Sequence, residues 1–464
     1  MAPVMTTRNK TDYSSPWRYA SNGSDAYFAG NSNSNQVAMI GQHEVGDGEN
    51  NARLILRTSS GSGWSHLMFK TGDTIVGRLY LDENNLFLSN NNNPSGTNNT
   101  SVGVNALASA NASSSDNTAI GNHSLSILQG GKYNSAIGAY SYSQCLTGTG
   151  NSSIGYQSLY NASGNYNTAI GYRTNYDDSV SAVLLRNVSN STVIGASAKG
   201  FGNSSTSIGY TANATGSNSV ALGSNSISAN DHSIAIGAEA KAGDTSVGGA
   251  SAIAIGKQSV AVPDNSIAIG ENANSSVTTN TNKNMIAIGY NTEASGEKSI
   301  AMGYQAVAPD ESSIAIGSEA TTNEYFSTAI GEQAKADKNA IAIGREAYAT
   351  GTNSIAIGGA AYYATTEHEG PEAGGNESIA IGRKAHANGD YSVAIGYNAC
   401  NGMTGDNKVC IGANSGPGSW IRNKFGTILS DNSKVIFLGD ADTTVFVPGV
   451  LRVGEDLSYS YFSY

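Results

Sequence analysis

Acidic residues and a histidine form one dense cluster, Glu367, His368 and Glu369, within the segment 362–377. Carboxylates and imidazoles are the side chains that bind divalent metals and transfer protons. Metal binding would require the three side chains to converge, but neighbouring residues of an extended segment point in opposite directions. We therefore interpret the segment as a solvated loop, with contact to another molecule as the alternative, and expect neither a metal nor a cofactor.

A second segment, 175–187, carries the adjacent carboxylates Asp177 and Asp178. A glycoside hydrolase needs two carboxylates that face each other across a groove, whereas adjacent residues of a strand face opposite ways. The chain also lacks Gly-x-Ser-x-Gly, Gly-x-Gly-x-x-Gly and phosphate-binding-loop motifs. The sequence therefore predicts that the protein is not an enzyme. The two segments supply the candidate surface-contact residues Tyr176, Asp177, Asp178, Arg186, Tyr362, Tyr363, Glu367, His368 and Glu369.

Charged residues make up only 13% of the 464 residues, and the formal net charge is −11. No run of lysine and arginine is long enough to follow a phosphate backbone, so nucleic acid is not expected as a partner. Residues 1–17 lack the apolar stretch of a signal peptide, and no run approaches the roughly 18 apolar residues of a membrane span. We expect a protein made in the cytoplasm without an export signal and without membrane insertion.

The three cysteines, Cys145, Cys400 and Cys410, show neither a Cys-x-x-Cys pair nor a histidine at zinc-binding spacing. Cys410 stands in KVCIG where other repeats read SIAIG, so it replaces an alanine. We therefore expect inert thiols and a small buried side chain at Cys410.

The elements that must position these residues come from a repeat, most often Ser-Ile-Ala-Ile-Gly. Its glycine recurs most often every 14 residues, as from Gly209 to Gly223, and every 16 to 18 residues in the earlier units. Apolar or small residues alternate with period two, which is a strand signature. A 14-residue unit therefore holds two short strands and two turns, with glycine supplying backbone freedom at a corner. The repeat glycines include Gly223, Gly237, Gly270, Gly303 and Gly317.

The repeat restricts the size of the side chains on both faces of each strand. Ile234 and Ile236 point to one face, and Ala235 points to the other. We expect the isoleucines to fill the narrow interior and the alanines to form a second packed face, suited to contact between chains. One coil encloses little core, so stacking is required and lateral association would help. The pattern predicts an oligomeric all-β parallel solenoid, although periodicity does not fix the number of chains.

Tyrosine is abundant, with 24 residues, and eight of them lie between residues 133 and 176. Exposed aromatic rings suit the recognition of saccharides and proteins. The alternative is that the rings pack between coils, because the longer units of this region leave more room. We favour this packing interpretation.

Two known families resemble the repeats. NSVALGSNSISANDHSIAIGAEAKAG, residues 218–243, resembles the YadA-like head of trimeric autotransporter adhesins. This resemblance implies a left-handed parallel β-roll in each chain and a homotrimer. Longer units such as NSSIGYQSLYNASGNYNTAIGYRT, residues 151–174, resemble the repeats of bacteriophage tail fibres. The repeats extend over residues 101–415.

The flanking segments favour the phage fibre over the autotransporter. FKTGDTIVGRLYLDENN, residues 69–85, and the segment 448–453 resemble phage fibre sequences. No signal peptide, coiled-coil stalk, membrane-anchor barrel or triple-β chaperone domain is evident in the sequence. We expect three parts, namely an N-terminal β attachment or capping domain at 1–100, a YadA-like β-roll at 101–415 and a C-terminal β cap or tip at 416–464.

These observations predict a structural, homotrimeric virion fibre, most simply a tail fibre, that contributes to recognition of the host surface and to adhesion. Its partners would be copies of itself, other virion or tail proteins, and a bacterial surface glycan or protein. One alternative is a neck or capsid fibre without a receptor. Another is the adhesin head of a trimeric autotransporter.

Overall fold

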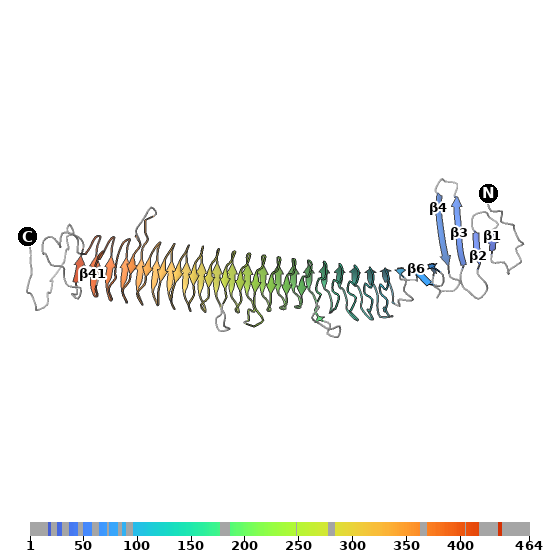
Figure 1. Cartoon of the computed structure of the whole chain (residues 1–464), viewed down its shortest axis with the longest axis horizontal. Helices are drawn as coiled ribbons and strands as arrows, with labels where there is room; N and C mark the ends of the chain where they lie inside the picture. Colours follow the sequence, from blue (N-terminus) through green and yellow to red (C-terminus); the bar gives the residue numbers. More distant parts are fainter. Residues whose placement is uncertain are drawn as a thin grey trace, which may run out of the picture. The chain divides into compact units, whose positions relative to one another are not determined.

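A computed structural model describes seven strands between residues 17 and 89 and the ranges 96–176, 186–246, 248–276, 284–361, 369–403, 405–416 and 435–438. The chain divides into two units, Met1–Asn218 and Ser219–Tyr464, and each is described by itself. Every regular element among the described residues is a β-strand (Figure 1). In this part of the chain, no helix has the length and hydrophobicity needed to cross a membrane.

The first unit begins with two antiparallel arrangements. β1 (Trp17–Tyr19), β2 (Ala26–Ala29), β3 (Val37–Glu44) and β4 (Asn50–Arg57) form a four-stranded sheet. β5 (Ser65–Thr71), β6 (Thr74–Leu81) and β7 (Leu86–Ser89) form a meander whose last strand pairs in parallel with β8 (Thr100–Val102). This pairing covers the edge that the first coil would otherwise leave open, and open edges invite aggregation. The domain boundary near residue 100 stays a prediction.

The rest of the first unit is a stack of coils, each contributing one three-residue strand in parallel register with the next. These strands are β8, β9 (Thr118–Ile120), β10 (Ser135–Ile137), β11 (Ser152–Ile154), β13 (Thr168–Ile170), β15 (Thr192–Ile194) and β17 (Thr206–Ile208). Two-residue strands form the opposite face, namely β12 (Ala162–Ser163), β14 (Arg186–Asn187), β16 (Lys199–Gly200) and β18 (Asn213–Ala214).

The second unit repeats this plan with shorter coils, and Figure 1 shows its strands side by side. We call the face made by the three-residue strands the long-strand face. Its strands are β19 (Val220–Leu222), β21 (Ile234–Ile236), β23 (Ile253–Ile255), β25 (Ile267–Ile269), β27 (Ile286–Ile288), β29 (Ile300–Met302), β31 (Ile314–Ile316), β33 (Thr328–Ile330), β35 (Ile341–Ile343), β37 (Ile355–Ile357), β39 (Ile379–Ile381) and β40 (Val393–Ile395), followed by β41 (Lys408–Ile411) and β42 (Val435–Leu438).

The opposite face of the second unit, the short-strand face, consists of two-residue strands. They are β20 (Ile227–Ser228), β22 (Lys241–Ala242), β24 (Val260–Ala261), β26 (Asn274–Ser275), β28 (Glu293–Ala294), β30 (Val307–Ala308), β32 (Thr321–Thr322), β34 (Lys335–Ala336), β36 (Tyr348–Ala349) and β38 (Glu372–Ala373). The expected all-β parallel solenoid with units of about 14 residues is confirmed. Its left-handed sense and the three-chain assembly stay predictions.

Alanine, and not isoleucine, fills the interior of the coils, so the expected orientation of the strands is wrong. Ala235 is fully buried, as are Ala240 and Ala242 of the same coil, whereas Ile236 is 36% exposed and Ile234 is half-buried. The physical reason is the thinness of the coil. The side-chain oxygens of Ser228 and Ser233 meet across it at 2.7 Å, so the space between the two strands suits side chains much smaller than isoleucine.

The corner glycines are confirmed in their structural role. Gly223 has φ +133° and Gly237 has φ +134°, a region that only glycine adopts without strain. A Cβ at Gly223 would lie 2.6 Å from the carbonyl carbon of Gly237 in the next coil. Stacking therefore requires glycine at this corner, because backbone packs directly on backbone. The same conformation occurs at Gly270, Gly303 and Gly317.

The longer coils of the first unit bury an additional side chain each. The fourth residue after the corner glycine turns inward with positive φ in these coils, and the 14-residue coils place an outward side chain at this position. The inward residues are Leu107, Leu125, Tyr142 and Leu159, all essentially buried. The extra two to four residues therefore enclose a wider core, which explains the 16 to 18-residue spacing of this region.

Candidate interaction surfaces

The isoleucines form a continuous apolar surface on the long-strand face of the second unit. Each of its strands from β19 to β40 presents two outward side chains, most often both isoleucine. Ile236, Ile269, Ile343 and Ile357 are 36–38% exposed. The register pairs equivalent residues of successive coils, as at Ile267 and Ile286, so the rows run along the stack. Large exposed apolar surfaces on soluble proteins mark contact sites.

The short-strand face is mixed in character. Its outward residues within the second unit include charged, amide, hydroxyl and apolar side chains, namely Lys241, Val260, Asn274, Glu293, Val307, Thr321, Lys335, Tyr348 and Glu372. The two faces of the same coil therefore differ, and the long-strand face is the one suited to lateral contact between chains. The sequence analysis predicted this contact at the alanines, but the structure buries the alanines inside the coils.

An aromatic column follows the corner of the longer coils. His123 stacks on Tyr140 with 5.0 Å between ring centroids, and Tyr156 stacks on Tyr172 at 5.5 Å. Tyr140 and Tyr156 meet edge to face at 6.2 Å. The column therefore combines face-to-face and edge-to-face contacts between successive coils. This column supports the fold, because aromatic pairs of this kind stabilise neighbouring elements.

The packing interpretation of the tyrosines is correct for the buried Tyr142 and for the rings of the aromatic column. Tyr142 is buried inside a wide coil, and its hydroxyl accepts a hydrogen bond from the side-chain amide of Asn151 at 2.8 Å. Tyr133 and Tyr166 are instead mostly exposed, at 64% and 62%. Burial raises the pKa of Tyr142 well above its ordinary value. The signal that separates these residues is position, since only Tyr142 is the fourth residue after its corner glycine.

Of the first predicted contact segment, the structure describes the two ends. Tyr176 is half-buried, and the guanidinium of Arg173 lies over its ring at 4.0 Å from the centroid. Arg186 is part of β14, which pairs with β12. Asp177 and Asp178 lie outside the described residues. Their role as surface contacts stays a prediction.

Of the predicted contact residues in the second segment, the structure describes Glu369. Its carboxylate accepts a hydrogen bond from Arg383 at 3.1 Å and forms an ion pair with Lys384 at 3.0 Å. The hydrogen bond from Lys384 is the main cause that lowers the pKa of Glu369. Glu369 therefore ties the end of the insertion to the following coil. Tyr362, Tyr363, Glu367 and His368 lie outside the described residues.

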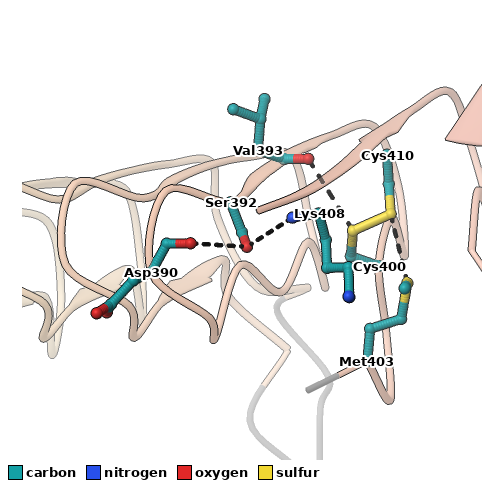
Figure 2. The surroundings of a disulfide bond; sticks show 7 residues. All are labelled: Asp390, Ser392, Val393, Cys400, Met403, Lys408 and Cys410. Carbon is teal, nitrogen blue, oxygen red and sulfur yellow. Dashed lines mark hydrogen bonds between the residues drawn. A yellow bond between two sulfur atoms is a disulfide. The ribbon is translucent and has the colours of Figure 1, made fainter. Parts of the chain in front are cut away.

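The expectation of three inert thiols is wrong for two of the cysteines. Cys400 and Cys410 form a disulfide with 5.5 Å between their Cα atoms (Figure 2). Cys400 is the fourth residue after Gly396 and turns inward with φ +52°, while Cys410 occupies the inward position that Ala394 has in the preceding coil. The sequence search for Cys-x-x-Cys spacing missed the pair because coil closure brings these two positions together.

Further contacts surround the disulfide. The sulfur of Met403 lies 3.7 Å from that of Cys410 (Figure 2). The backbone amide of Lys408 donates to the Ser392 hydroxyl at 3.1 Å. Cys145 is buried and has no disulfide partner, as expected of an inert thiol, and burial raises its pKa. Among the described residues, no group of three metal-ligating side chains converges.

Comparison with known families identifies the repeat. Seven segments match the YadA head domain repeat, namely residues 202–226, 214–240, 248–273, 286–306, 294–320, 338–361 and 373–399. The chain therefore carries adhesin-type β-roll repeats of the YadA head. A search of curated proteins found no match to the chain.

Proposed function

We propose that the protein is a homotrimeric, non-catalytic fibre of a virion surface that holds adhesive surfaces against the host bacterium. The observation that supports this proposal most directly is the isoleucine-covered long-strand face beside an interior made of alanine. The YadA head repeats support the adhesive role, since the matched segments are those of an adhesin head.

The apolar face favours assembly for an energetic reason. An isoleucine about one third exposed, such as Ile269 or Ile343, gains roughly 1–2 kcal/mol when its remaining surface is buried. Repetition of this gain along the stack favours a side-by-side arrangement of chains. Three chains are the number that the resemblance to trimeric adhesin heads implies.

A virion location is supported by the flanking sequences. Residues 69–85 and 448–453 resemble phage fibre segments. Immunogold electron microscopy of phage particles and of bacterial surfaces, with an antibody against the short-strand face, tests this location. Labelling of a particle appendage is expected, and labelling of an uninfected cell surface would contradict it.

A second candidate, the head of a trimeric autotransporter, is favoured by the match to the YadA head repeat. In that case the encoding gene would specify an upstream export signal and a downstream membrane anchor. Sequencing the complete gene with its flanks separates the two candidates.

The molar mass of the protein in solution tests the number of chains in the assembly. Light scattering of the purified chain is expected to give three times the chain mass. Ile269→Lys combined with Ile343→Lys places charges on the apolar face and is expected to shift the mass to one chain. Val260→Lys combined with Val307→Lys, on the short-strand face, is the matched control and is expected to leave the mass unchanged. A compact single chain in the unchanged protein would contradict the proposal.

A further inference from the structure

Tyr290 and Tyr304 form an exposed aromatic pair at a corner of the second unit. Each is the first residue after its corner glycine, in two successive coils. Their ring centroids lie 5.5 Å apart with 10° between the ring planes, and the two residues are 47% and 49% exposed. The structure describes every residue from 284 to 361, so the pair and the coils that follow it are fully described. Exposed tyrosines of this kind are typical of recognition surfaces.

The coil that follows Tyr304 leaves the outer face of its ring uncovered. One face of the ring is turned toward Tyr290, and the other is turned away from it. The next coil carries Ser318 at the equivalent position, and the backbone amide of Glu319 donates to the carbonyl of Tyr304 at 2.7 Å. The side chain of Ser318 is too short to extend across a ring. The carboxylate of Glu319 accepts a hydrogen bond from Gln333, one coil further along, at 2.8 Å.

Two other tyrosine rings of the second unit are covered by a cation. The guanidinium of Arg383 lies 4.7 Å from the ring centroid of Tyr397, which is also the first residue after its corner glycine. The ammonium of Lys335 lies 5.0 Å from the ring centroid of Tyr348. A cation on a ring face occupies the surface on which a ligand would stack. Tyr304 differs from these rings, because its coil neighbour is the short Ser318.

Hydrogen-bonding groups continue the column beyond the open ring face. The hydroxyl of Ser318 comes first, followed by the exposed carboxylate of Glu332, which is the first residue after the next corner glycine. The backbone amide of Gln333 donates to the carbonyl of Ser318 at 2.8 Å, which sets the two coils directly on each other. A carboxylate accepts hydrogen bonds from hydroxyl groups but repels another anion. This order of groups fits a molecule with an apolar face, several hydroxyls and no negative charge.

We propose that Tyr304 binds a neutral hexose unit of a surface polysaccharide. The C–H face of the sugar stacks on the outer face of the Tyr304 ring, and its hydroxyls form hydrogen bonds with Ser318 and Glu332. Tyr290 supports the Tyr304 ring from the opposite side. This inference rests on the adhesive role proposed above and specifies its ligand class.

The binding test uses the full chain and defined oligosaccharides. Saturation-transfer NMR and isothermal titration calorimetry are performed with oligomers of β-linked glucose, of β-linked galactose and of β-linked N-acetylglucosamine, and with galacturonic acid oligomers of matched length. Saturable binding of at least one neutral oligomer is expected, with saturation strongest at the C–H face of the sugar. The acidic oligomer should bind about tenfold more weakly. Failure of all three neutral oligomers to bind, or equal affinity for the acidic one, overturns the inference.

The variants place the binding at Tyr304. Tyr304→Ala is expected to weaken binding about tenfold. Ser318→Arg covers the open ring face with a side chain that two other coils carry at this position, Arg345 and Arg383, so the fold is retained while binding is lost. Tyr397→Ala is the matched control, because Arg383 already covers that ring. Unchanged binding in Ser318→Arg, or an equal loss in Tyr397→Ala, overturns the assignment.

A second copy of the chain is the competing occupant, because this corner borders the long-strand face. Light scattering of Tyr304→Ala distinguishes the two. The molar mass is expected to equal that of the unchanged protein, since the ring contacts a sugar and not a neighbouring chain. A fall to the mass of one chain would assign the ring to the contact between chains and overturn the inference.

Adhesion to host cells separates this inference from the proposed function. If Ser318→Arg loses oligosaccharide binding and adhesion together, the inference and the function are both supported. If it adheres as well as the unchanged protein, adhesion uses another surface, and the ligand inference falls while the function stands. If the unchanged protein binds neutral oligomers but adheres to no host cell, the proposed function falls.

Discussion

The side-chain amide of Asn134 donates a hydrogen bond to Oδ1 of Asn117 in the preceding coil, 2.9 Å away. The backbone amide of Asn134 donates to the same oxygen at 3.0 Å. Asn99 and Asn151 continue this arrangement on either side, so buried asparagines form a ladder along the wide coils. Each amide also donates to a backbone carbonyl, as Asn134 does to Gly148 at 2.8 Å.

Asn134→Ala is therefore expected to destabilise the first unit. The substitution leaves Oδ1 of Asn117 and the carbonyl of Gly148 with fewer donors and opens a small cavity, which together cost about 2–4 kcal/mol. Chemical denaturation followed by circular dichroism measures the loss. Asn122→Ala, at an exposed position of an adjacent coil, is the control and should change the unfolding free energy by less than about 0.5 kcal/mol. Equal effects of the two substitutions would exclude a special role for the ladder.

The solenoid could be predicted from the sequence because its period is carried by two kinds of residue with strict backbone roles. Glycine at the corner and period-two alternation in the strand are both local signals, and both were interpreted correctly at Gly223 and Gly237. The orientation of Ile234 and Ala235 could not be decided in this way. Alternation states that two faces differ, but which face is inside depends on the thickness of the coil, a property of both strands together.

The candidate sites were less predictable for a related reason. Cys400 and Cys410 approach only because one lies at an inward turn and the other at an inward strand position. Such relationships between layers appear only after the sequence is aligned coil by coil.

Gly317 provides a test of the corner at which the backbones of successive coils pack directly on each other. Its φ is +136°, and a Cβ there would lie 2.5 Å from the carbonyl carbon of Gly331. Gly317→Ala is expected to cost at least about 3 kcal/mol, from strain and from separation of the two layers. Gly402→Ala is the matched control, because Gly402 also has positive φ, at +74°, but a Cβ would meet nothing within 4 Å. Gly402→Ala should reduce the unfolding free energy by about 1 kcal/mol. Thermal unfolding of both variants measures the two losses of stability. An unchanged melting temperature for Gly317→Ala would contradict the requirement for glycine at this corner.

The disulfide should stabilise the end of the second unit. Cys410→Ala removes the covalent link but retains an interior side chain of the kind found at Ala394. The link closes a loop between residues 10 apart in sequence, so its loss is expected to reduce stability by about 2–3 kcal/mol. Hydrogen exchange should increase in β40 and β41 and remain unchanged in β21. Reductant should reproduce the effect in the unchanged protein and add nothing in the variant. An unaltered exchange pattern after reduction would contradict a structural role.

Acid should loosen the attachment of the second insertion. The folded-state pKa of Glu369 lies below its ordinary value of 4.5, chiefly because Lys384 donates to the carboxylate. A lowered carboxyl pKa stabilises the folded form above the ordinary value, and this contribution disappears as pH falls through the folded-state pKa. The protection of backbone amides around Glu369 and Lys384 against hydrogen exchange, relative to their intrinsic rates at each pH, is therefore expected to fall below about pH 4.5. Glu369→Gln should show the faster exchange already at neutral pH, with a weaker dependence on acid. Identical pH profiles for the two proteins would rule out this contribution.

The assignment of inside and outside is tested by two adjacent residues of one strand, Ala268 and Ile269. Ala268 is fully buried, so Ala268→Leu must displace the facing strand and is expected to destabilise each chain by about 1–3 kcal/mol or more. Ile269 is 37% exposed, so Ile269→Ala should leave the fold of the single chain nearly intact and weaken the contact between chains. Unfolding measured at two protein concentrations distinguishes the effects, because only a loss of assembly depends on concentration. The reverse result, with a concentration-dependent loss for Ala268→Leu and a concentration-independent one for Ile269→Ala, would restore the isoleucines to the interior.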